Sequence, residues 1–163
     1  MNKRLGFMLI LMVIIIIGCT RDETTIKKAI EQLDYKVYVP SYIPAELELE
    51  TAVLKDGLIL ISYQNVDGTK YVEFSQDATS RALNIEGLLT FKKSGEDPYE
   101  RNATRRIQEI GPFVGVYDIN EKLTSYSYEF IKPNLQSDSY PFYWISSVGI
   151  PEAEFLKIVS SLK

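Results

Sequence analysis

The residue types that most often carry out chemistry are scarce in this sequence. The chain of 163 residues contains no histidine and one cysteine, Cys19. A Ser-His-Asp triad, a Cys-His pair, a histidine-ligated metal and an internal disulfide are therefore excluded. A carboxylate pair of the glycosidase type needs only two of the 22 acidic residues, but the sequence singles out no such pair. We expect a protein that is not an enzyme, with no catalytic residue, no metal site and no cofactor.

The setting of Cys19 indicates a covalent modification. The basic pair Lys3-Arg4 precedes an almost continuous apolar run, Leu5–Ile17. A run of this length fits a signal peptide and is shorter than the roughly 20 residues that a membrane-spanning helix needs. The run ends in Ile16-Ile17-Gly18-Cys19, which resembles the bacterial lipobox. The resemblance implies cleavage after Gly18 and a diacylglyceryl group on the Cys19 thiol.

The leader also predicts where the protein is located. An N-terminal transmembrane anchor is the alternative to a lipoprotein signal peptide. In both cases the basic residues before the apolar run place the remainder of the chain outside the cytoplasm. Acyl chains attach a protein to a bilayer by burying their CH2 groups. The expected organisation is a signal peptide over 1–18, a lipidated N-terminus with a short helix over 19–34, and an extracytoplasmic domain over 35–163, lipid-anchored to the cell membrane.

A second group of residues suggests a binding surface. Aromatic side chains alternate along two predicted strands, and the candidate binding face consists of Tyr126, Tyr128, Phe130, Phe142 and Trp144. Tyrosine combines a large apolar ring with a hydroxyl group, so a surface rich in tyrosine can line a groove for an acyl chain, a glycan or a peptide. The alternative is that these rings form the ordinary core beneath the C-terminal helix.

Two helices are expected at the ends of the mature chain. Residues 22–34 place Ile26, Ile30 and Leu33 at helical spacing. Residues 151–163 place four apolar residues in one stripe, which must be buried against the rest of the domain. The four are Phe155, Ile158, Val159 and Leu162.

Between the helices the pattern predicts strands. In residues 46–54, Leu47, Leu49, Thr51 and Val53 alternate with three glutamates, which predicts a buried face and a solvated face. Further strands are expected at residues 58–64, 70–76, 105–110, 113–118, 123–131 and 140–148, whereas residues 83–91 fit either a strand or a helical turn. Short connections favour one antiparallel meander. The predicted fold is α+β: a single curved antiparallel sheet of about six to eight strands, with the two helices packed on it.

Charge limits the possible partners. Without Lys3 and Arg4 the mature chain has 16 basic and 22 acidic residues, a net charge of −6. Such a domain is repelled by phosphate backbones, so no nucleic acid is expected as a partner. The expected partners are the membrane, through the lipid anchor, and an envelope protein or lipid.

Two segments resemble a known family. Val39-Pro40-Ser41-Tyr42-Ile43-Pro44 and the closing helix Phe155–Leu162 are similar to the ends of a domain of unknown function from low-GC Gram-positive bacteria. That domain occurs in anti-sigma-factor-like membrane proteins and in sporulation and germination lipoproteins. The resemblance implies a curved antiparallel sheet with packed helices, akin to lipoprotein-carrier folds, and no known catalytic residues.

These observations lead to two hypotheses. The first is a membrane-anchored lipoprotein with a non-catalytic binding or interaction domain at the outer face of the cytoplasmic membrane. The alternative is a lipid or lipoprotein carrier or chaperone that uses a concave, aromatic-lined sheet face. The carrier requires an open cavity lined by the five aromatic residues rather than one filled by the C-terminal helix.

Overall fold

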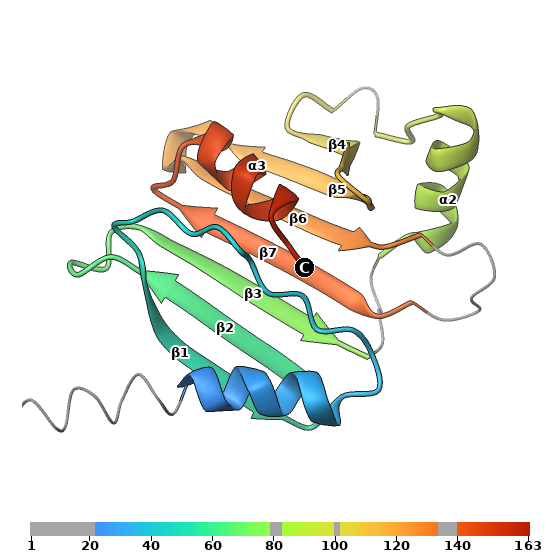
Figure 1. The fold of residues 1–163 in the computed structure, drawn as a ribbon. Helices are drawn as coiled ribbons and strands as arrows, with labels where there is room; N and C mark the ends of the chain where they lie inside the picture. Colours follow the sequence, from blue (N-terminus) through green and yellow to red (C-terminus); the bar gives the residue numbers. More distant parts are fainter. Residues whose placement is uncertain (1–21, 79–82, 100–101, 134–139) are drawn as a thin grey trace, which may run out of the picture.

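The computed structural model describes residues 22–78, 83–99, 102–133 and 140–163, so Gly18 and Cys19 lie outside the described residues. The chain forms one antiparallel sheet of seven strands with helices packed on it (Figure 1), which confirms the predicted α+β class. The strands are β1 (Glu48–Lys55), β2 (Leu58–Gln64), β3 (Tyr71–Asp77), β4 (Arg105–Ile110), β5 (Phe113–Asn120), β6 (Ser125–Ile131) and β7 (Phe142–Val148). A short 3-10 helix, η1 (Glu121–Leu123), connects β5 to β6.

The strand order departs from the expected single meander. The order across the sheet is β1-β2-β3-β7-β6-β5-β4, with antiparallel pairing throughout. After β3 come helix α2 (Ile85–Ser94) and then β4 at the opposite edge of the sheet, and β5, β6 and β7 follow in order, which places β7 beside β3. The last strand therefore lies in the centre, paired with both β3 and β6.

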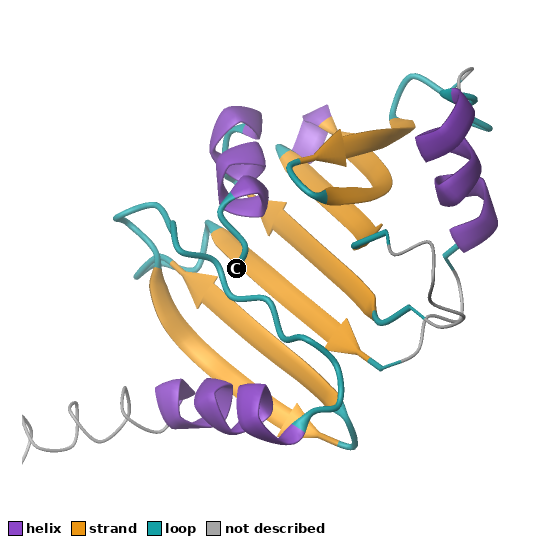
Figure 2. Cartoon of the chain, turned by 45° about the vertical axis from the view of Figure 1, so that its right-hand side comes forward, coloured by secondary structure: helices purple, strands orange, loops and turns teal. Residues whose placement is uncertain are grey.

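One face of the sheet, called here the inner face, carries the main core. It is covered by the N-terminal helix (residues 22–32), the extended segment 35–43 and helix α3 (Glu152–Ser160), which lie on the same side of the sheet in Figure 2. Phe155, Ile158 and Val159 of α3 are fully buried, and Leu162 is 8% exposed. The predicted apolar stripe of the C-terminal helix is confirmed.

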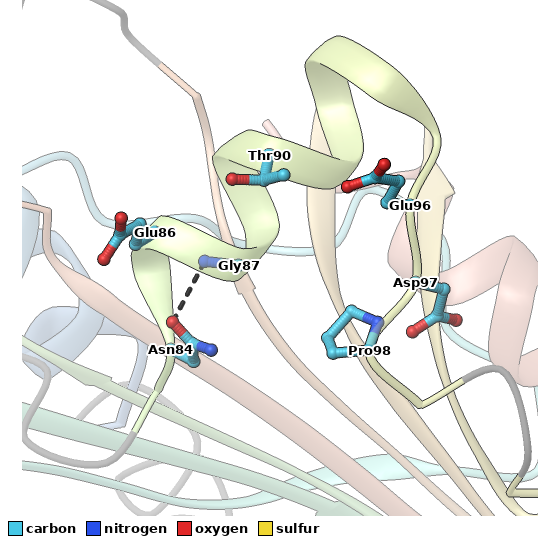
Figure 3. A pocket seen from close by; sticks show the side chains of 7 residues that line it. All are labelled: Asn84, Glu86, Gly87, Thr90, Glu96, Asp97 and Pro98. Atoms are coloured by element: carbon cyan, nitrogen blue, oxygen red, sulfur yellow. Dashed lines mark hydrogen bonds between the residues drawn. The ribbon is translucent and has the colours of Figure 1, made fainter.

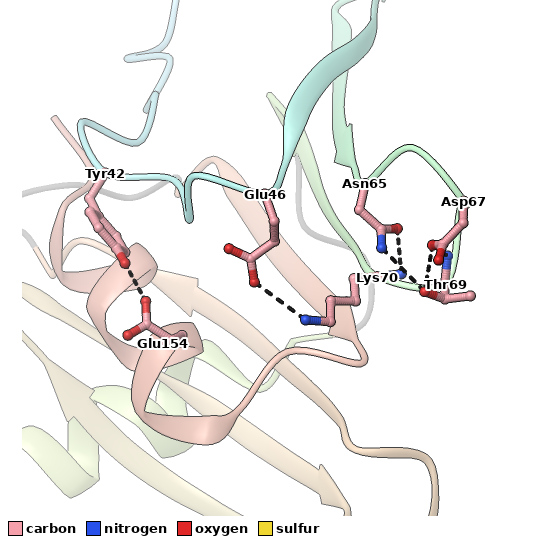
Figure 4. Close-up of polar contacts among 7 residues, drawn as sticks. All are labelled: Tyr42, Glu46, Asn65, Asp67, Thr69, Lys70 and Glu154. Atoms are coloured by element: carbon pink, nitrogen blue, oxygen red, sulfur yellow. Dashed lines mark hydrogen bonds and ion pairs between the residues drawn. The ribbon is translucent and has the colours of Figure 1, made fainter.

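The extended segment is joined to the chain's last residues. Val39 and Lys163 exchange backbone hydrogen bonds of 3.3 and 3.1 Å, and the Ser41 amide donates to the Ser161 carbonyl at 3.1 Å. Figure 4 shows that the Tyr42 hydroxyl also donates to the Glu154 carboxylate on α3. The extended segment is thus bound to α3 and to the residues that follow it, which closes the inner face.

The opposite, outer face is covered only in part by a described helix. Leu88 of α2 is buried on this side among residues of β4, β5 and β6: Ile107, Val114, Val116 and Ile131. The Asn84 side chain caps the helix by accepting from the Gly87 amide at 2.9 Å, and Gly95 ends it in the left-handed conformation. Residues 83–91, for which the sequence fits either a strand or a helical turn, therefore lie largely within helix α2.

The predicted faces of β1 are wrong beyond its first residues. The pairing with β2 shifts between Leu49 and Thr51, which is a β-bulge at Glu50. A bulge adds one residue and so reverses the alternation of side chains. Leu49 packs on the inner core as expected, but Ala52 is buried there next, and Val53 is 46% exposed on the outer face. Similarly, in the N-terminal helix Ala29 is buried and Ile30 is 54% exposed.

Polar groups satisfy the turns and the sheet edges. In the β2–β3 turn, Asn65 accepts from the Lys70 amide at 2.9 Å and Asp67 accepts from the Thr69 amide at 3.0 Å, while Lys70 reaches Glu46 (Figure 4). At the β1 edge, Asp22 accepts from the Ala52 amide at 3.1 Å. At the β4 edge, Asp97 accepts from the Ile107 amide at 2.9 Å. Each carboxylate occupies an edge amide that a further strand would otherwise use.

Candidate binding face

The five aromatic residues of the predicted binding face do not form one surface. On β6, the side chains of Tyr126, Tyr128 and Phe130 lie on the inner face. Phe130 pairs with Tyr143 of β7, which is also buried in the inner core. Because side chains alternate along a strand, Phe142 and Trp144 point to the outer face. The expected single face is therefore divided between the two sides of the sheet.

The inner aromatic residues form a filled core. Tyr128 is fully buried and Phe130 is 2% exposed. Phe155 of α3 lies against the rings of Tyr117 and Tyr126, with centroids 5.9 and 5.8 Å apart. The Tyr128 hydroxyl donates to the Gln108 carbonyl at 2.8 Å, and burial raises the pKa of Tyr128 well above its ordinary value. Helix α3 thus occupies the space that a lipid would need on this face.

The outer face over β1, β2, β3 and β7 carries an exposed depression, unlike the filled inner face. Trp144 lines a depression of about 290 Å3 on this face. Its outward-facing lining comes from three further strands: Thr51, Val53, Leu60, Ser62 and Glu73. Val53 and Leu60, which are neighbours across the β1–β2 pair, are 46% and 41% exposed and form a small apolar patch. Neither belongs to either buried core.

Acidic groups flank the indole ring. Trp144 pairs across the sheet with Ser75 on one side and with Glu129 on the other. Side chains opposite one another on antiparallel strands have Cβ atoms about 5 Å apart. Glu73 lies on the same face, two residues before Ser75 on β3. Within the described part of the chain, no hydrogen bond or ion pair involves the carboxylate of Glu73 or of Glu129.

A second depression, of about 360 Å3, lies beside α2 (Figure 3) and is lined in part by Asn84, Glu86, Glu96 and Asp97. Two of these residues have structural partners. Asn84 caps the helix, and the two Asp97 oxygens accept from the amides of Tyr99 and Ile107 at 2.8 and 2.9 Å. This depression is a junction between α2 and the edge of the sheet, and it offers little free binding chemistry.

Two further findings concern metal binding and membrane-spanning helices. Among the described residues, no group of three or more histidine, cysteine, aspartate and glutamate side chains is placed to hold a metal ion. In the same ranges, no helix has both the length and the hydrophobicity required to cross a bilayer.

The aromatic pattern alone does not predict the exposed depression, because it places Phe142 and Trp144 in one set with the rings of β6. A signal for it was present in Leu58-Ile59-Leu60-Ile61, where four consecutive apolar residues leave none for a solvated face. Since successive side chains of a strand point to opposite sides, such a run places apolar groups on both faces. Ile59 and Ile61 are buried on the inner face, whereas Leu60 is exposed on the outer face.

No protein family model matches the chain, and no curated protein matches it. Among solved structures, a protein from Bacteroides thetaiotaomicron is similar, with a TM-score of 0.41 and 16% sequence identity. The similarity covers 74% of this chain and 42% of that protein, so the chain spans less than half of its length.

Proposed function

We propose that this protein is a lipoprotein, anchored through Cys19 at the extracytoplasmic face of the cell membrane, whose domain is a non-catalytic binding module. The binding surface is the outer sheet face around Trp144, with Val53, Leu60 and Glu73. One observation carries this proposal: a patch with two large exposed apolar side chains lies on a sheet whose other face is fully packed. Concave surfaces lined by apolar and aromatic side chains with a few polar groups are typical of binding sites.

The carrier alternative receives no support from the geometry. It requires an open aromatic cavity on the concave face. Tyr128 and Phe130 are buried instead, and Phe155 lies against the neighbouring rings. Without space beside these rings, an acyl chain could enter only after displacement of α3. The outer depression, at about 290 Å3 and partly hydroxyl-lined, suits side chains of a partner better than a long acyl chain.

Anchoring through Cys19 would hold the domain close to the bilayer. Asp22 is fixed to the β1 edge by its hydrogen bond with the Ala52 amide. Only Thr20 and Arg21 stand between Cys19 and Asp22, so three Cα–Cα steps give a reach of at most about 10 Å. The β1 edge would therefore lie next to the lipid headgroups. The partner that fits this position is a membrane protein or an envelope component near the outer membrane surface.

The anchor is tested with Cys19→Ala in cells supplied with an alkyne-labelled fatty acid. The wild-type protein is expected to be labelled, shortened by its leader and recovered with membranes. The variant is expected to stay unlabelled and uncleaved. Cleavage after Gly18 in the variant, or equal fatty-acid labelling of both proteins, would contradict a lipoprotein anchor at Cys19.

The binding surface is tested by carbene footprinting of the full-length protein, in membranes from producing cells and after purification. Occupancy by a partner predicts that labelling around Leu60 is lower in membranes than in the purified protein. Val66, which is fully exposed in the adjacent turn, is the internal control and should be labelled equally in both. Equal labelling around Leu60 in both preparations would contradict the proposal.

A further inference from the structure

Three aromatic rings of this protein share one arrangement, in which a cation lies over the ring and also contacts a carboxylate. The three sets are Lys157 with Tyr42 and Glu154, Arg106 with Tyr117 and Glu152, and Arg105 with Tyr99 and Asp118. The cations lie 4.0 to 5.1 Å from the ring centroids, and their nitrogens lie 3.3 to 3.8 Å from the carboxylate oxygens. The ring and the carboxylate together attract the cation.

Trp144 has the ring and the neighbouring carboxylates of this arrangement, but no cation from the described part of the chain lies over it. Glu129 is its direct cross-strand neighbour, and Glu73 lines the same depression. Neither carboxylate has an ion-pair partner within the described ranges, whereas Glu46 and Glu109 are paired with Lys70 and Lys92. Indole is the best of the aromatic rings for binding a cation. The site is complementary to a positive charge, which no described residue of this chain supplies.

The apolar side chains beside the ring add a second requirement. Val53 and Leu60 are cross-strand neighbours on the same depression as Trp144. A free inorganic cation would leave these side chains exposed to water. A peptide in which lysine or arginine stands next to aliphatic residues would satisfy both the carboxylates and the apolar patch.

We propose that the outer face binds a basic, partly apolar segment of a partner protein, with a lysine or arginine over Trp144 between Glu73 and Glu129. Aliphatic side chains of the segment rest on Val53 and Leu60. This inference rests on the proposed binding function and specifies the chemistry of its partner. Charge complementarity also determines the sign of the partner's charge: the partner segment is positive, because this domain is acidic.

The chain offers a direct reporter, since Trp144 is its sole tryptophan. The full-length lipoprotein in a nonionic detergent is titrated with acetyl-Lys-Val-Lys-Val-Lys-amide while indole emission is recorded. The matched probe is acetyl-Glu-Val-Glu-Val-Glu-amide. The Glu73→Gln/Glu129→Gln double variant removes both charges from the face. The Glu31→Gln/Glu86→Gln double variant makes the same change of net charge at exposed positions elsewhere, on the N-terminal helix and on α2.

The expected result is a saturable change in Trp144 emission with the lysine peptide and none with the glutamate peptide. Binding should weaken about tenfold in Glu73→Gln/Glu129→Gln, because the lysine keeps its contact with the indole ring and loses both carboxylates, and it should remain within about twofold of wild type in the control variant. Equal weakening in both variants would overturn the proposal, because it would show attraction to net charge alone.

Other outcomes would assign the face to another occupant. A response to a neutral oligosaccharide but not to the lysine peptide, or an emission change with protein concentration alone, would overturn the cationic partner in favour of a glycan or of a second copy of the chain. If neither peptide binds while carbene labelling around Leu60 still decreases in membranes, the binding function stands and the cationic partner is wrong. If that labelling is also unchanged, both proposals fail.

Discussion

The side-chain amide of Gln76 pairs with the backbone of Tyr38 as a strand residue would. Gln76 Nε2 donates to the Tyr38 carbonyl, and the Tyr38 amide donates to Gln76 Oε1, both at 2.7 Å. Gln76 is 2% exposed, so these two bonds are made away from water. The pair fixes the extended segment 35–43 across the inner face, with help from the Tyr143 hydroxyl, which donates to the Lys36 carbonyl at 2.8 Å.

Gln76→Leu should therefore destabilise the protein. Two buried backbone groups of Tyr38 lose their partners, which predicts a decrease of about 2–4 kcal/mol in the free energy of unfolding. Urea denaturation followed by circular dichroism measures the change. Gln64→Leu at the end of β2, whose side chain is only partly buried, is the control and should cost less than about 1 kcal/mol. Equal losses would mean that the Gln76 pairing does not hold the segment.

The two faces of the sheet should respond differently to truncation. Tyr128→Ala removes a fully buried ring from the inner core and should lower the free energy of unfolding by about 3–5 kcal/mol. Leu60→Ala, on the outer face, should lower it by less than about 1 kcal/mol, since the side chain is already 41% exposed. A small loss for Tyr128→Ala would instead indicate an open inner groove and would revive the carrier hypothesis.

Much of the fold was predictable because local patterns are strong where one face is buried. The strand at residues 58–64 has the predicted bounds, and the α3 residues Phe155, Ile158 and Val159 are buried as their spacing indicates. Two features depend on non-local structure. The bulge at Glu50 reversed the faces of β1, and the placement of β7 beside β3 is set by pairing rather than by sequence order.

The candidate binding face was predictable only in part, because it too depends on non-local strand pairing. Trp144 was in the predicted set, but its companions Leu60 and Glu73 come from strands about 70 to 85 residues earlier in the chain. The sequence pattern predicts the alternation of side chains correctly within β6 and within β7. The register between β6 and β7 decides whether their aromatic side chains share a face. In this sheet Phe130 lies opposite Tyr143 rather than Phe142 or Trp144.

Removal of one buried hydroxyl should stabilise the protein. Ser147 on β7 is fully buried, and its Oγ has no hydrogen-bond partner among the described residues. A buried hydroxyl without a partner keeps its desolvation cost, so Ser147→Ala should raise the free energy of unfolding by about 1 kcal/mol. Ser146→Ala, one residue earlier on the outer face, should change it by less than about 0.5 kcal/mol. Destabilisation by Ser147→Ala in urea titrations would contradict the packing described here.

Alkaline pH should destabilise the inner core. Burial, with smaller contributions from the charges of Asp77 and Asp34, raises the pKa of Tyr35 to about 12, and burial raises the pKa of Tyr128 further. Unfolded tyrosines ionise near pH 10, so the folded state keeps protons that the unfolded state releases. Stability is fully present below about pH 10 and falls as pH rises through the folded-state values, by about 1.4 kcal/mol per pH unit for Tyr128. Unfolding titrations from about pH 9 to about pH 11.5 measure this slope, and a flat profile would show that these hydroxyls are not buried.

The identity of the binding surface is tested most directly by photo-crosslinking in living cells. A benzophenone amino acid replaces Leu60 on the outer face, or Leu123 in η1, which is 63% exposed and distant in the strand order from β2. We predict a discrete protein adduct from position 60, none from position 123, and loss of the adduct when Glu73→Gln and Glu129→Gln are combined with the probe. An adduct from both positions, no adduct from position 60, or a lipid adduct alone would contradict a protein-binding face at Trp144.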